Sequence, residues 1–276
     1  MIKEKKPEKI ILDFSYEDSV SGIKESILAC GYPCETGTSA EINHNSKPGN
    51  MDTAAHILYI TDDAYKARKA KKCGAAVLIY LHCGNAEECF EGFRFYIEGF
   101  EDADATYYTR VYQREQRIPW TIGETERLLI REMVPEDTDA LYELYRNKRV
   151  VEYMEDLPKD REEETEYIRD YIDKVYAVFG FGMWVILLKE NGELIGRVGF
   201  QNSEEENLVE IGFLISPEHQ QKGYAYEACN AALQYLKEEY AYLQVRAVCH
   251  ADNRPAISLC RRLGLECVTL DGNAHK

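Results

Sequence analysis

The sequence predicts a mixed α/β (α+β) fold in two parts: a small Rossmann-like parallel α/β domain, then a mixed, mostly antiparallel sheet flanked by helices. In the first half, short apolar runs alternate with amphipathic helical stretches, which is the pattern of a parallel sheet. In the second half, apolar runs flank Asn191-Gly192, a strong signal for a tight hairpin between antiparallel strands. We therefore place a first domain at residues 1–119, a linker at 120–126 and a second domain at 127–276.

The composition supports two globular domains with an acidic surface. The chain has 276 residues, of which 45% are hydrophobic and 30% charged, so each half can bury a core of its own. The formal net charge of −16 argues against nonspecific nucleic-acid binding and against an anionic membrane surface as partner. This charge suits a cationic or amine-bearing substrate, although excess acidic residues also serve solubility alone.

The start of the sequence predicts a cytoplasmic protein. Residues 1–7 lack the apolar core of a signal peptide, and no later apolar run is long enough to span a membrane. In that compartment we expect the nine cysteines to be reduced rather than paired in disulfides. Neither Cys30 with Cys34 nor His82-Cys83 with Cys89 has a second pair at ligand spacing, so we expect no metal site.

Strand and helix signals alternate along the first domain. Gly31 and Gly74 mark the ends of two predicted helices, because glycine is the usual helix stop. Residues 98–116 are acidic and tyrosine-rich and predict a further helix. The expected strands lie at residues 9–14, 55–60 and 75–81.

Two groups of carboxylates follow strands of the first domain, where open α/β sheets place their ligands. Asp13 in Ile-Leu-Asp-Phe-Ser and Asp62-Asp63 in Tyr-Ile-Thr-Asp-Asp resemble the first and last motifs of the haloacid-dehalogenase-like hydrolases. The likeness implies phosphatase chemistry, but Ser15 stands where that family keeps its acid/base aspartate, and Lys47-Pro48 lies too close to the next strand for a full-length hydrolase core. We expect a non-catalytic accessory domain for substrate docking or dimerisation.

The second domain shows an antiparallel meander between helices. Pro135 and the acidic residues after it introduce a helix, since negative charge favours a helix N-terminus. Two further helices are expected at residues 161–178 and 253–263. The expected strands lie at residues 128–133, 183–188, 193–201, 208–215 and 242–249.

The junction after residues 208–215 organises this domain. The strand stops at Pro217, a short polar loop follows, and a helix begins at Gly223. The first N–H groups of a helix lack internal partners and carry the positive end of its dipole, so they can hold a phosphate. Gly223 lets that backbone approach a ligand closely, and Lys222 adds a positive charge.

The loop sequence resembles a known signature. It is similar to the Gln/Arg-x-x-Gly-x-Gly/Ala motif of the GCN5-related N-acetyltransferases, and the preceding strand resembles the version in ribosomal-protein-acetylating members. The resemblance covers residues 126–270 and implies a GNAT-type sheet with acetyl-CoA as co-substrate, its pyrophosphate on the loop amides. The residues that it assigns to this loop are Gln220, Gln221, Lys222, Gly223, Tyr224 and Ala225.

A second block supports the same resemblance. Asn253-Arg-Pro-Ala-Ile-Ser-Leu-Cys-Arg-Arg-Leu-Gly-Leu is similar to the family pattern Asn-x-x-Ser/Ala-x-x-Leu-Tyr-x-x-x-Gly-Phe. It implies that Asn253 contacts the pantetheine arm. It also implies that the strand amides of Phe213, Leu214 and Ile215 align this arm and polarise the thioester carbonyl.

Acetyl transfer from a thioester needs a neutral amine, a donor for the developing oxyanion and a proton for the leaving thiolate. Glu210, beside glycine on the organising strand, is the candidate base. The alternative is a carboxylate that only binds substrate or pairs with an arginine. Cys260 stands where the family often keeps a general-acid tyrosine, and a packed apolar cysteine is the alternative there.

The acceptor side is less well defined. In the family the first two helices frame it, so Glu152, Tyr153, Glu155 and Asp156 between them either meet a cationic acceptor or form a solvated loop. The family's final strand is missing after residue 270. The sheet then closes with one strand fewer, or the first domain or a second copy in a homodimer covers the edge.

We therefore expect a two-domain acyltransferase that moves an acetyl group from acetyl-CoA directly to a primary amine of a small molecule or a protein N-terminus. A different interpretation is a non-catalytic CoA-binding sensor that carries a degenerate haloacid-dehalogenase-like domain. A third is a phosphatase of the first domain that depends on Asp13.

Overall fold

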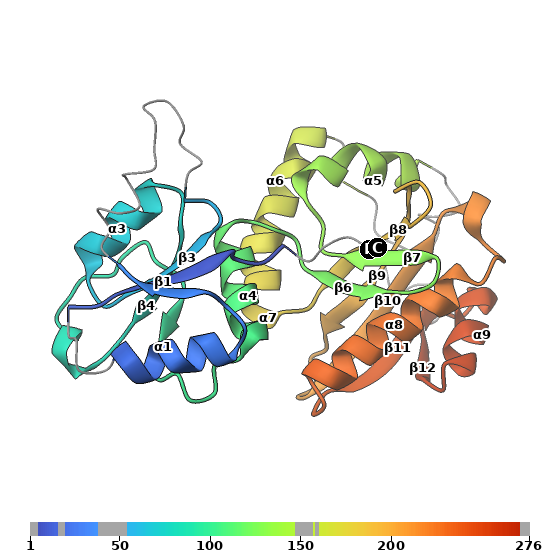
Figure 1. Cartoon of the computed structure of the whole chain (residues 1–276). Coiled ribbons are helices and arrows are strands. Elements are labelled where there is room, and N and C mark those ends of the chain that lie inside the picture. The colour runs from blue at the N-terminus through green and yellow to red at the C-terminus, as the bar shows by residue number, and fades with distance from the viewer. Residues whose placement is uncertain (1–4, 16–19, 38–53, 147–156, 158–159, 271–276) are drawn as a thin grey trace. The chain divides into compact units, whose positions relative to one another are not determined.

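The computed structural model describes residues 5–15, 20–37, 54–146, 157 and 160–270. By their internal contacts the residues divide into two compact units, Met1–Ile118 and Pro119–Lys276 (Figure 1). Sheets, helices and cores are described below for each unit by itself. The predicted α/β fold, with a parallel sheet first and a mixed sheet second, is confirmed.

The first unit is built on a parallel sheet with the strand order β2-β1-β3-β4-β5. Every neighbouring pair in this sheet is parallel. The two outermost strands are short and carry no apolar period, so sequence patterning did not find them. The strands are β1 (Lys9–Asp13), β2 (Cys34–Thr36), β3 (Ile57–Thr61), β4 (Ala76–Tyr80) and β5 (Tyr96–Ile97).

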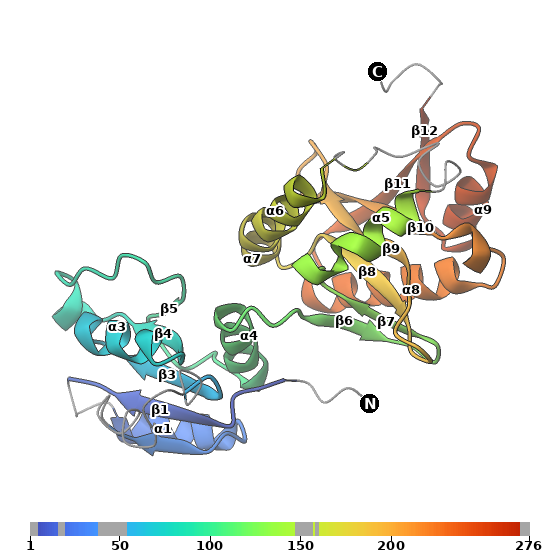
Figure 2. The same cartoon turned by 90° about the horizontal axis from the view of Figure 1, so that it is seen from above.

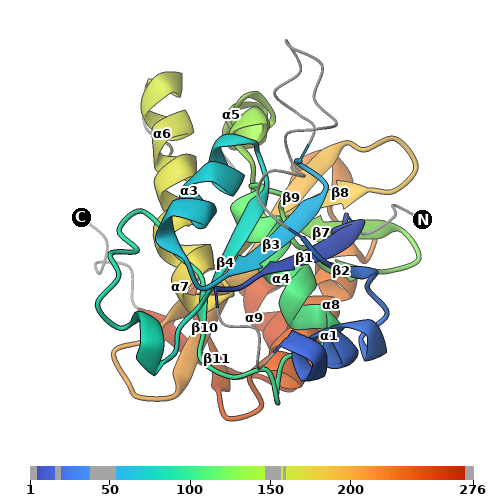
Figure 3. The same ribbon diagram turned by 60° about the vertical axis from the view of Figure 1, so that its left-hand side comes forward.

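Helices cover both faces of the parallel sheet (Figure 3). Helices α1 (Val20–Ala29) and α4 (Ala105–Glu115) pack on one face, where Ile27 and Tyr108 share a core with Leu58. Helix α3 (Ala64–Lys72) packs on the other face through its alanines. Successive residues of β1, β3 and β4 point to opposite faces of the sheet, and each face has its own hydrophobic core. These strands are therefore almost continuously apolar. A short 3₁₀ helix, Cys83–Asn85, follows β4.

The second unit is built on a sheet with the strand order β12-β11-β10-β9-β8-β7-β6. Pairs from β6 to β10 are antiparallel, and β11 and β12 are added in parallel. The hairpin between β8 and β9 that Asn191-Gly192 predicted is present, but residues 189–193 connect the two strands, so the turn is longer than the two residues expected. Gly192 has a φ of 75° in this connection. The strands are β6 (Thr121–Glu124), β7 (Leu128–Arg131), β8 (Met183–Leu188), β9 (Leu194–Asn202), β10 (Leu208–Ile215), β11 (Gln244–His250) and β12 (Glu266–Leu270).

Residues 121–124 differ from the sequence-based expectation. They were placed in a linker, but they form β6, which pairs with β7 at the edge of the sheet. The pairing register shifts between Thr121 and Gly123, so this short strand contains an irregularity and no clean alternation. A four-residue strand with a glycine has too little pattern to stand out beside the proline and glycine that flank it.

Helices also lie on both faces of the second sheet (Figure 2). Leu144 and Tyr145 of α5 (Thr138–Tyr145) cover Leu214, and Tyr235 of α8 (Tyr224–Glu239) packs on Trp184 from the opposite face. The remaining helical elements are the 3₁₀ turn Pro135–Asp137, α6 (Arg161–Tyr171), a π turn (Ile172–Tyr176), α7 (Ala177–Phe179), the 3₁₀ turn Pro217–His219 and α9 (Arg254–Arg262).

Two further expectations, on the sheet edge and on the acceptor side, are not tested by the described residues. Strand β12 is one edge of the second sheet, and what covers this edge stays a hypothesis. Glu152, Tyr153, Glu155 and Asp156, like Lys47-Pro48, lie outside the described residues. Among the residues that are described, none of the helices has the length and apolar character needed to span a membrane.

Candidate functional site

The parallel pair β10 and β11 separates part of the way along. The two strands pair from Leu208 with Gln244 to Ile211 with Ala247, and the pairing stops there. Strand β10 continues to Ile215 against β9, while β11 continues to His250 against β12. Beyond this point, the facing edges of β10 and β11 are therefore no longer hydrogen-bonded to each other. Such an edge can take an extended ligand that carries amide groups, as an added strand would.

The loop after β10 leads from this divergence to a helix N-terminus. Gln220 Nε2 donates to the carbonyl of Ile215 over 3.0 Å, and Ser216 Oγ lies 2.7 Å from His219 Nδ1, so side chains hold the loop in place. Gln221 and Gly223 adopt left-handed φ values of 61° and 86°. Residues 220–223 are exposed, which leaves the loop open to a ligand.

The N-terminus of α8 has no side-chain cap. Gly223 is the N-cap residue and offers no side chain to the first-turn amides, whereas most helices carry an acceptor there. These amides and the positive end of the helix dipole favour an anion at this position. A glycine also suits the left-handed φ of this residue, and any side chain added here would approach Arg127.

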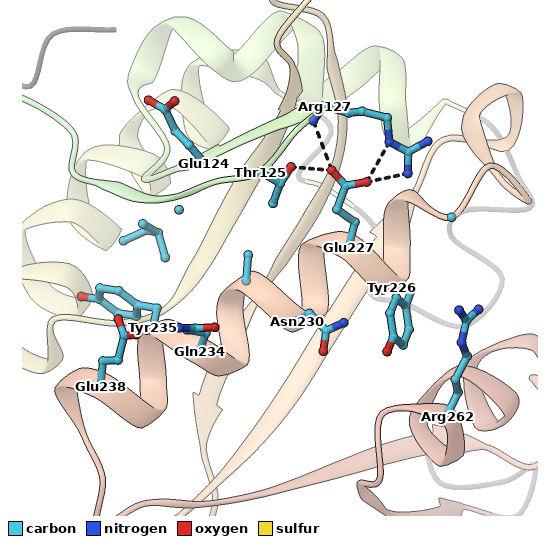
Figure 4. A pocket seen from close by; sticks show the side chains of 14 residues that line it. Glu124, Thr125, Arg127, Tyr226, Glu227, Asn230, Gln234, Tyr235, Glu238 and Arg262 are labelled. Atoms are coloured by element: carbon cyan, nitrogen blue, oxygen red, sulfur yellow. Dashed lines mark hydrogen bonds and ion pairs between the residues drawn. The ribbon is translucent and has the colours of Figure 1, made fainter. Parts of the chain in front are cut away.

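Arg127 is a residue of this junction that sequence reasoning missed (Figure 4). Its Nη1 donates to the carbonyl of Lys222 over 3.0 Å, and its Nε donates to Glu227 Oε2 over 2.8 Å. The guanidinium lies 4.3 Å from the ring centre of Tyr224. Arg127 lies directly before β7, about a hundred residues earlier in the chain, so no local pattern could connect it to the loop.

Glu227 is the carboxylate that Arg127 holds at this helix terminus. Burial tends to raise the pKa of Glu227, but hydrogen bonds from Thr125 and Arg127 outweigh burial and lower it. The same hydrogen bond raises the pKa of Arg127. The carboxylate is therefore ionised and neutralised by Arg127, rather than left to repel an anion at Gly223.

A groove with a volume of about 780 Å³ runs along α8 (Figure 4). Strand β6 forms its other side, and it reaches Gly223 and Arg262. Phe213, Leu214 and Ile215 do not line it, and β6 is the edge of the sheet far from β11. The groove therefore adjoins the loop but is not the place where the two strands separate.

Asn253 lies at the start of α9, directly after β11. Its Oδ1 accepts a hydrogen bond from the amide of Ala256 over 3.2 Å, so the side chain is the N-cap of this helix. The residue is half-buried and follows the diverging end of β11. The structure thus shows a capping role, and contact with a ligand arm stays a prediction.

Glu210 is engaged by an arginine. Arg246 Nη2 and Nε donate to Glu210 Oε1 over 2.7 and 3.1 Å. The two residues face each other in the register of β10 and β11, two positions before Gly212 and the divergence. Pairing with an arginine was the alternative left open for this carboxylate. A role as base remains a hypothesis, and it requires Glu210 Oε2 to serve while Oε1 is bound.

Cys260 is enclosed in the core. Its exposed fraction is 0%, and its Sγ lies 4.0 Å from Cys249 Sγ. The contact with Cys249 lowers the pKa of the Cys260 thiol, whereas burial raises it. With no exposed surface, this thiol reaches a leaving thiolate only if α9 or β11 moves, so its role as general acid is unsupported by the geometry.

A buried charge lies on the face covered by α5 and α6. Arg197 on β9 has an exposed fraction of 8% and donates to the hydroxyl of Tyr145 over 3.1 Å. Glu164 on α6 is 2% exposed, and burial raises its pKa while Arg197 lowers it. Nothing in the spacing of the sequence singled out either residue, because each stands alone in an otherwise apolar or acidic stretch.

The carboxylates of the first unit have partners of their own. Asp13 Oδ1 lies 2.9 Å from Lys66 Nζ, and Tyr59 donates to the other oxygen. Asp62 Oδ1 accepts from the amide of Ser15 over 2.7 Å, and Oδ2 lies 3.2 Å from His82 Nε2. The sequence did not predict that Lys66 lies beside Asp13, because Lys66 is in the first turn of α3 and far from Asp13 in the chain. Whether this unit is a degenerate hydrolase stays a hypothesis.

The fold and the junction at Gly223 define an α/β domain in which an unpaired strand edge leads to an exposed, uncapped helix N-terminus. A family model for the acetyltransferase (GNAT) domain matches residues 127–266, and the chain belongs to this family. The protein is accordingly an acetyltransferase.

Three similar proteins illustrate the match. An uncharacterized N-acetyltransferase, YnaD of Bacillus subtilis, is 29% identical over 145 residues, which are 51% of this chain and 80% of YnaD. The uncharacterized N-acetyltransferase p20 of Bacillus licheniformis is 30% identical over 146 residues, covering 51% of this chain and 80% of p20. A solved GNAT acetyltransferase from Bacillus anthracis is similar at 27% identity with a TM-score of 0.44, over 51% of this chain and 81% of that one.

Proposed function

We propose that the second unit is an acetyl-CoA-dependent N-acetyltransferase that transfers the acetyl group directly to a primary amine. The observation that carries the proposal is the continuity of two features. Strands β10 and β11 separate after Ile211 and Ala247, and the free end of β10 leads straight to the uncapped N-terminus of α8. An extended amide-bearing arm followed by a pyrophosphate fits this order of groups.

The residues divide the binding work. The main chain of Phe213, Leu214 and Ile215 aligns the arm, because this segment has left β11. The amides of Gln221, Lys222, Gly223, Tyr224 and Ala225 surround the pyrophosphate, with Lys222 and the α8 dipole supplying positive charge. The amide of Gln220 donates to the carbonyl of Pro217 over 3.3 Å, so this residue supports the loop. Asn253, at the end of β11, meets the arm from the other strand.

The chemistry of transfer follows from these positions. Acetyl-CoA supplies the acetyl group as a thioester, which an uncharged amine can attack. The amides of β10 near Phe213 donate to the oxygen that becomes negative, and such pre-oriented donors are the largest single contribution in many acyl transfers. Glu210 accepts the proton of the amine, directly or through water, at Oε2, which also accepts a long hydrogen bond from Gln201 Nε2 over 3.4 Å.

The acceptor is an amine of a small molecule or of a protein N-terminus. The formal net charge of −16 favours cationic partners. On the face beneath α5 and α6, however, Arg197 is a buried positive charge beside Glu164. Both side chains are almost fully buried, so neither forms part of a surface that an acceptor would meet.

The decisive experiment is a calorimetric titration of acetyl-CoA into the full chain and into Gly223→Asp. The new carboxylate would cap α8 and oppose the pyrophosphate, and like charges in contact cost several kcal/mol, so affinity should fall by more than about 100-fold. Gly92→Asp is the matched control, because Gly92 is also exposed and has a φ of 89° against 86° at Gly223.

The outcomes separate the interpretations. Equal binding by Gly223→Asp and the unaltered chain would mean that the pyrophosphate lies elsewhere. Thiol release with an amine panel in the same sample would establish turnover and begin to identify the acceptor. Binding without thiol release from any amine would favour the CoA-binding sensor.

A further inference from the structure

Three cysteines from three elements meet in the second unit. Cys249 lies on β11, Cys260 on α9 and Cys267 on β12, and their sulfur atoms all lie within 4.8 Å of one another. The Sγ atoms of Cys249 and Cys260 are 4.0 Å apart. Cys260 is 0% and Cys249 8% exposed, whereas Cys267 is half-buried. We call this group the cysteine triad.

The fold, and not the spacing in the sequence, brings the triad together. In the parallel register of β11 and β12, Ala247 pairs with Cys267 and Cys249 pairs with Thr269. Cys249 and Cys267 are thus diagonal neighbours on one face of the sheet. Helix α9 lies between the two strands in sequence and places Cys260 on that same face. Unlike Cys30 with Cys34, or His82-Cys83 with Cys89, the members of the triad do not lie close together in the sequence.

We propose that the cysteine triad binds one thiophilic d¹⁰ cation, Zn²⁺ or Cu⁺, through three thiolates. Two sulfurs at about 2.3 Å from one ion and 120° apart are about 4.0 Å from each other, the separation of Cys249 and Cys260. Cys267 has to move inward by less than about 1 Å, which a half-buried side chain on an edge strand can do.

The donor set selects the class of ion. Among the residues that the structure describes, the group contains sulfur alone, with no carboxylate or imidazole. Soft thiolate ligands select Cu⁺ and Zn²⁺ over Mg²⁺, Ca²⁺ or Mn²⁺. The partial exposure of Cys267 gives the ion an entry path and gives Zn²⁺ room for water as a fourth ligand. The three thiols release their protons to solvent when the ion binds, so no oxidant or reductant is required.

The bound ion would tie β11, β12 and α9 together behind the diverging end of β11. It would also occupy Cys260, so a loaded protein would have no thiol at the position of the family tyrosine. The site does not depend on the proposed transferase activity, because none of its residues lines the loop at Gly223.

The test is a titration of the reduced full-length protein with Cd²⁺, which reports thiolate binding through an ultraviolet charge-transfer band. The band should saturate at one ion per chain. Cys267→Ser should weaken binding more than about tenfold, since a lost ligand costs at least as much as a lost supporting contact. Cys73→Ser is the matched control, because Cys73 is also half-buried but lies in the first unit. Displacement of Cd²⁺ by Zn²⁺ or by Cu⁺ then identifies the preferred ion.

A second readout guards against a variant that merely folds poorly. An ion that binds only the native state raises the unfolding temperature, so Cd²⁺ should raise Tm in the unaltered chain and in Cys73→Ser, but not in Cys267→Ser. A Cd²⁺ band of equal strength in Cys267→Ser and the unaltered chain would overturn the proposal. So would the absence of a saturable band, which would leave the triad as three packed thiols.

Discussion

The two units contain the same kind of junction and use it in opposite ways. In the first unit, β3 leads into α3, where Asp63 accepts from the amide of Lys66 over 2.8 Å and Glu88 accepts from the amide of Ala64 over 2.7 Å. In the second unit, β10 leads into α8, whose N-cap is Gly223 and has no side-chain acceptor. The first helix terminus is filled by carboxylates of its own unit, and the second is open to an external anion.

The comparison shows that a strand followed by a helix is not by itself an anion site. The start of α3 also offers first-turn amides and a helix dipole, but two carboxylates already accept from the amides of Ala64 and Lys66. At α8 the first-turn carboxylate, Glu227, is held by Arg127 instead. What distinguishes the two junctions is therefore the side chain at the N-cap and the partner of the nearest acid.

The largest effect should come from the paired carboxylates. In each unit a strand carboxylate is paired with a cation, since Asp13 of β1 meets Lys66 of α3 and Glu210 of β10 meets Arg246 of β11. If Glu210 is the base, Glu210→Gln should lower kcat by about 100-fold with little change in the affinity for acetyl-CoA. Steady-state kinetics on the unaltered chain and the variant would measure this.

Two controls sharpen that experiment. Glu205→Gln removes the other carboxylate bound to Arg246 and should leave kcat unchanged, as should Asp13→Asn in the first unit. If Glu210→Gln behaves like Glu205→Gln, the pairs in both units are structural and the base is another group.

A smaller effect is expected at the capped junction. Asp63→Ala removes the acceptor for the Lys66 amide and should lower the free energy of unfolding by about 1 kcal/mol, the usual cost of a lost N-cap. Urea unfolding followed by circular dichroism would measure it. Asp102→Ala, at an exposed turn of the same unit, is the control and should change little. An unchanged midpoint for Asp63→Ala would show that Glu88 alone satisfies α3.

The smallest effect concerns pH at α8. The pKa of Glu227 is lowered in the folded chain, so the unfolded chain binds more protons just below its own pKa of about 4.3. The resulting stability is complete above that pH and is lost as pH falls through the lower folded pKa. Glu227→Gln should remove this acid dependence and cost about 0.5 kcal/mol at neutral pH, because solvent screens the partly exposed pair with Arg127. The measurement is the unfolding midpoint of the unaltered chain and of Glu227→Gln at several pH values between about 3 and 5. If the pair with Arg127 contributes nothing, the two midpoints will change with pH by the same amount.

Local signals carried most of the fold. Asn191-Gly192 fixed the β8–β9 turn, Gly223 marked the start of α8, and the alternation along residues 208–215 gave β10 its two faces. These features depend on a few neighbouring residues, so a single sequence contains them. Strand β6 was missed because Thr121–Glu124 is short and irregular, and its existence depends on its pairing with β7.

The partners of the site could not be found in the same way. Glu227 meets Arg127 across a hundred residues of sequence. Lys66 of α3 meets Asp13 of β1, and other elements lie between them in the chain. Such contacts arise only when the sheet is assembled, and a charged residue in an exposed stretch gives no sign of its partner. The cysteine triad is the extreme case, since its three members lie on separate elements with no regular spacing.

The π turn after α6 has a consequence for chain length. One extra residue per turn allows Tyr171 and Tyr176 to lie with ring centres 5.0 Å apart, although an α-helix would place residues five apart on different sides. Tyr171 accepts from the amide of Met183 over 2.9 Å, and Tyr176 donates to the carbonyl of Met183, so both phenols hold the entry to β8. Residues 172–175 can therefore vary in identity during evolution more easily than in number, because deleting one would rotate α6 by about 100° relative to β8.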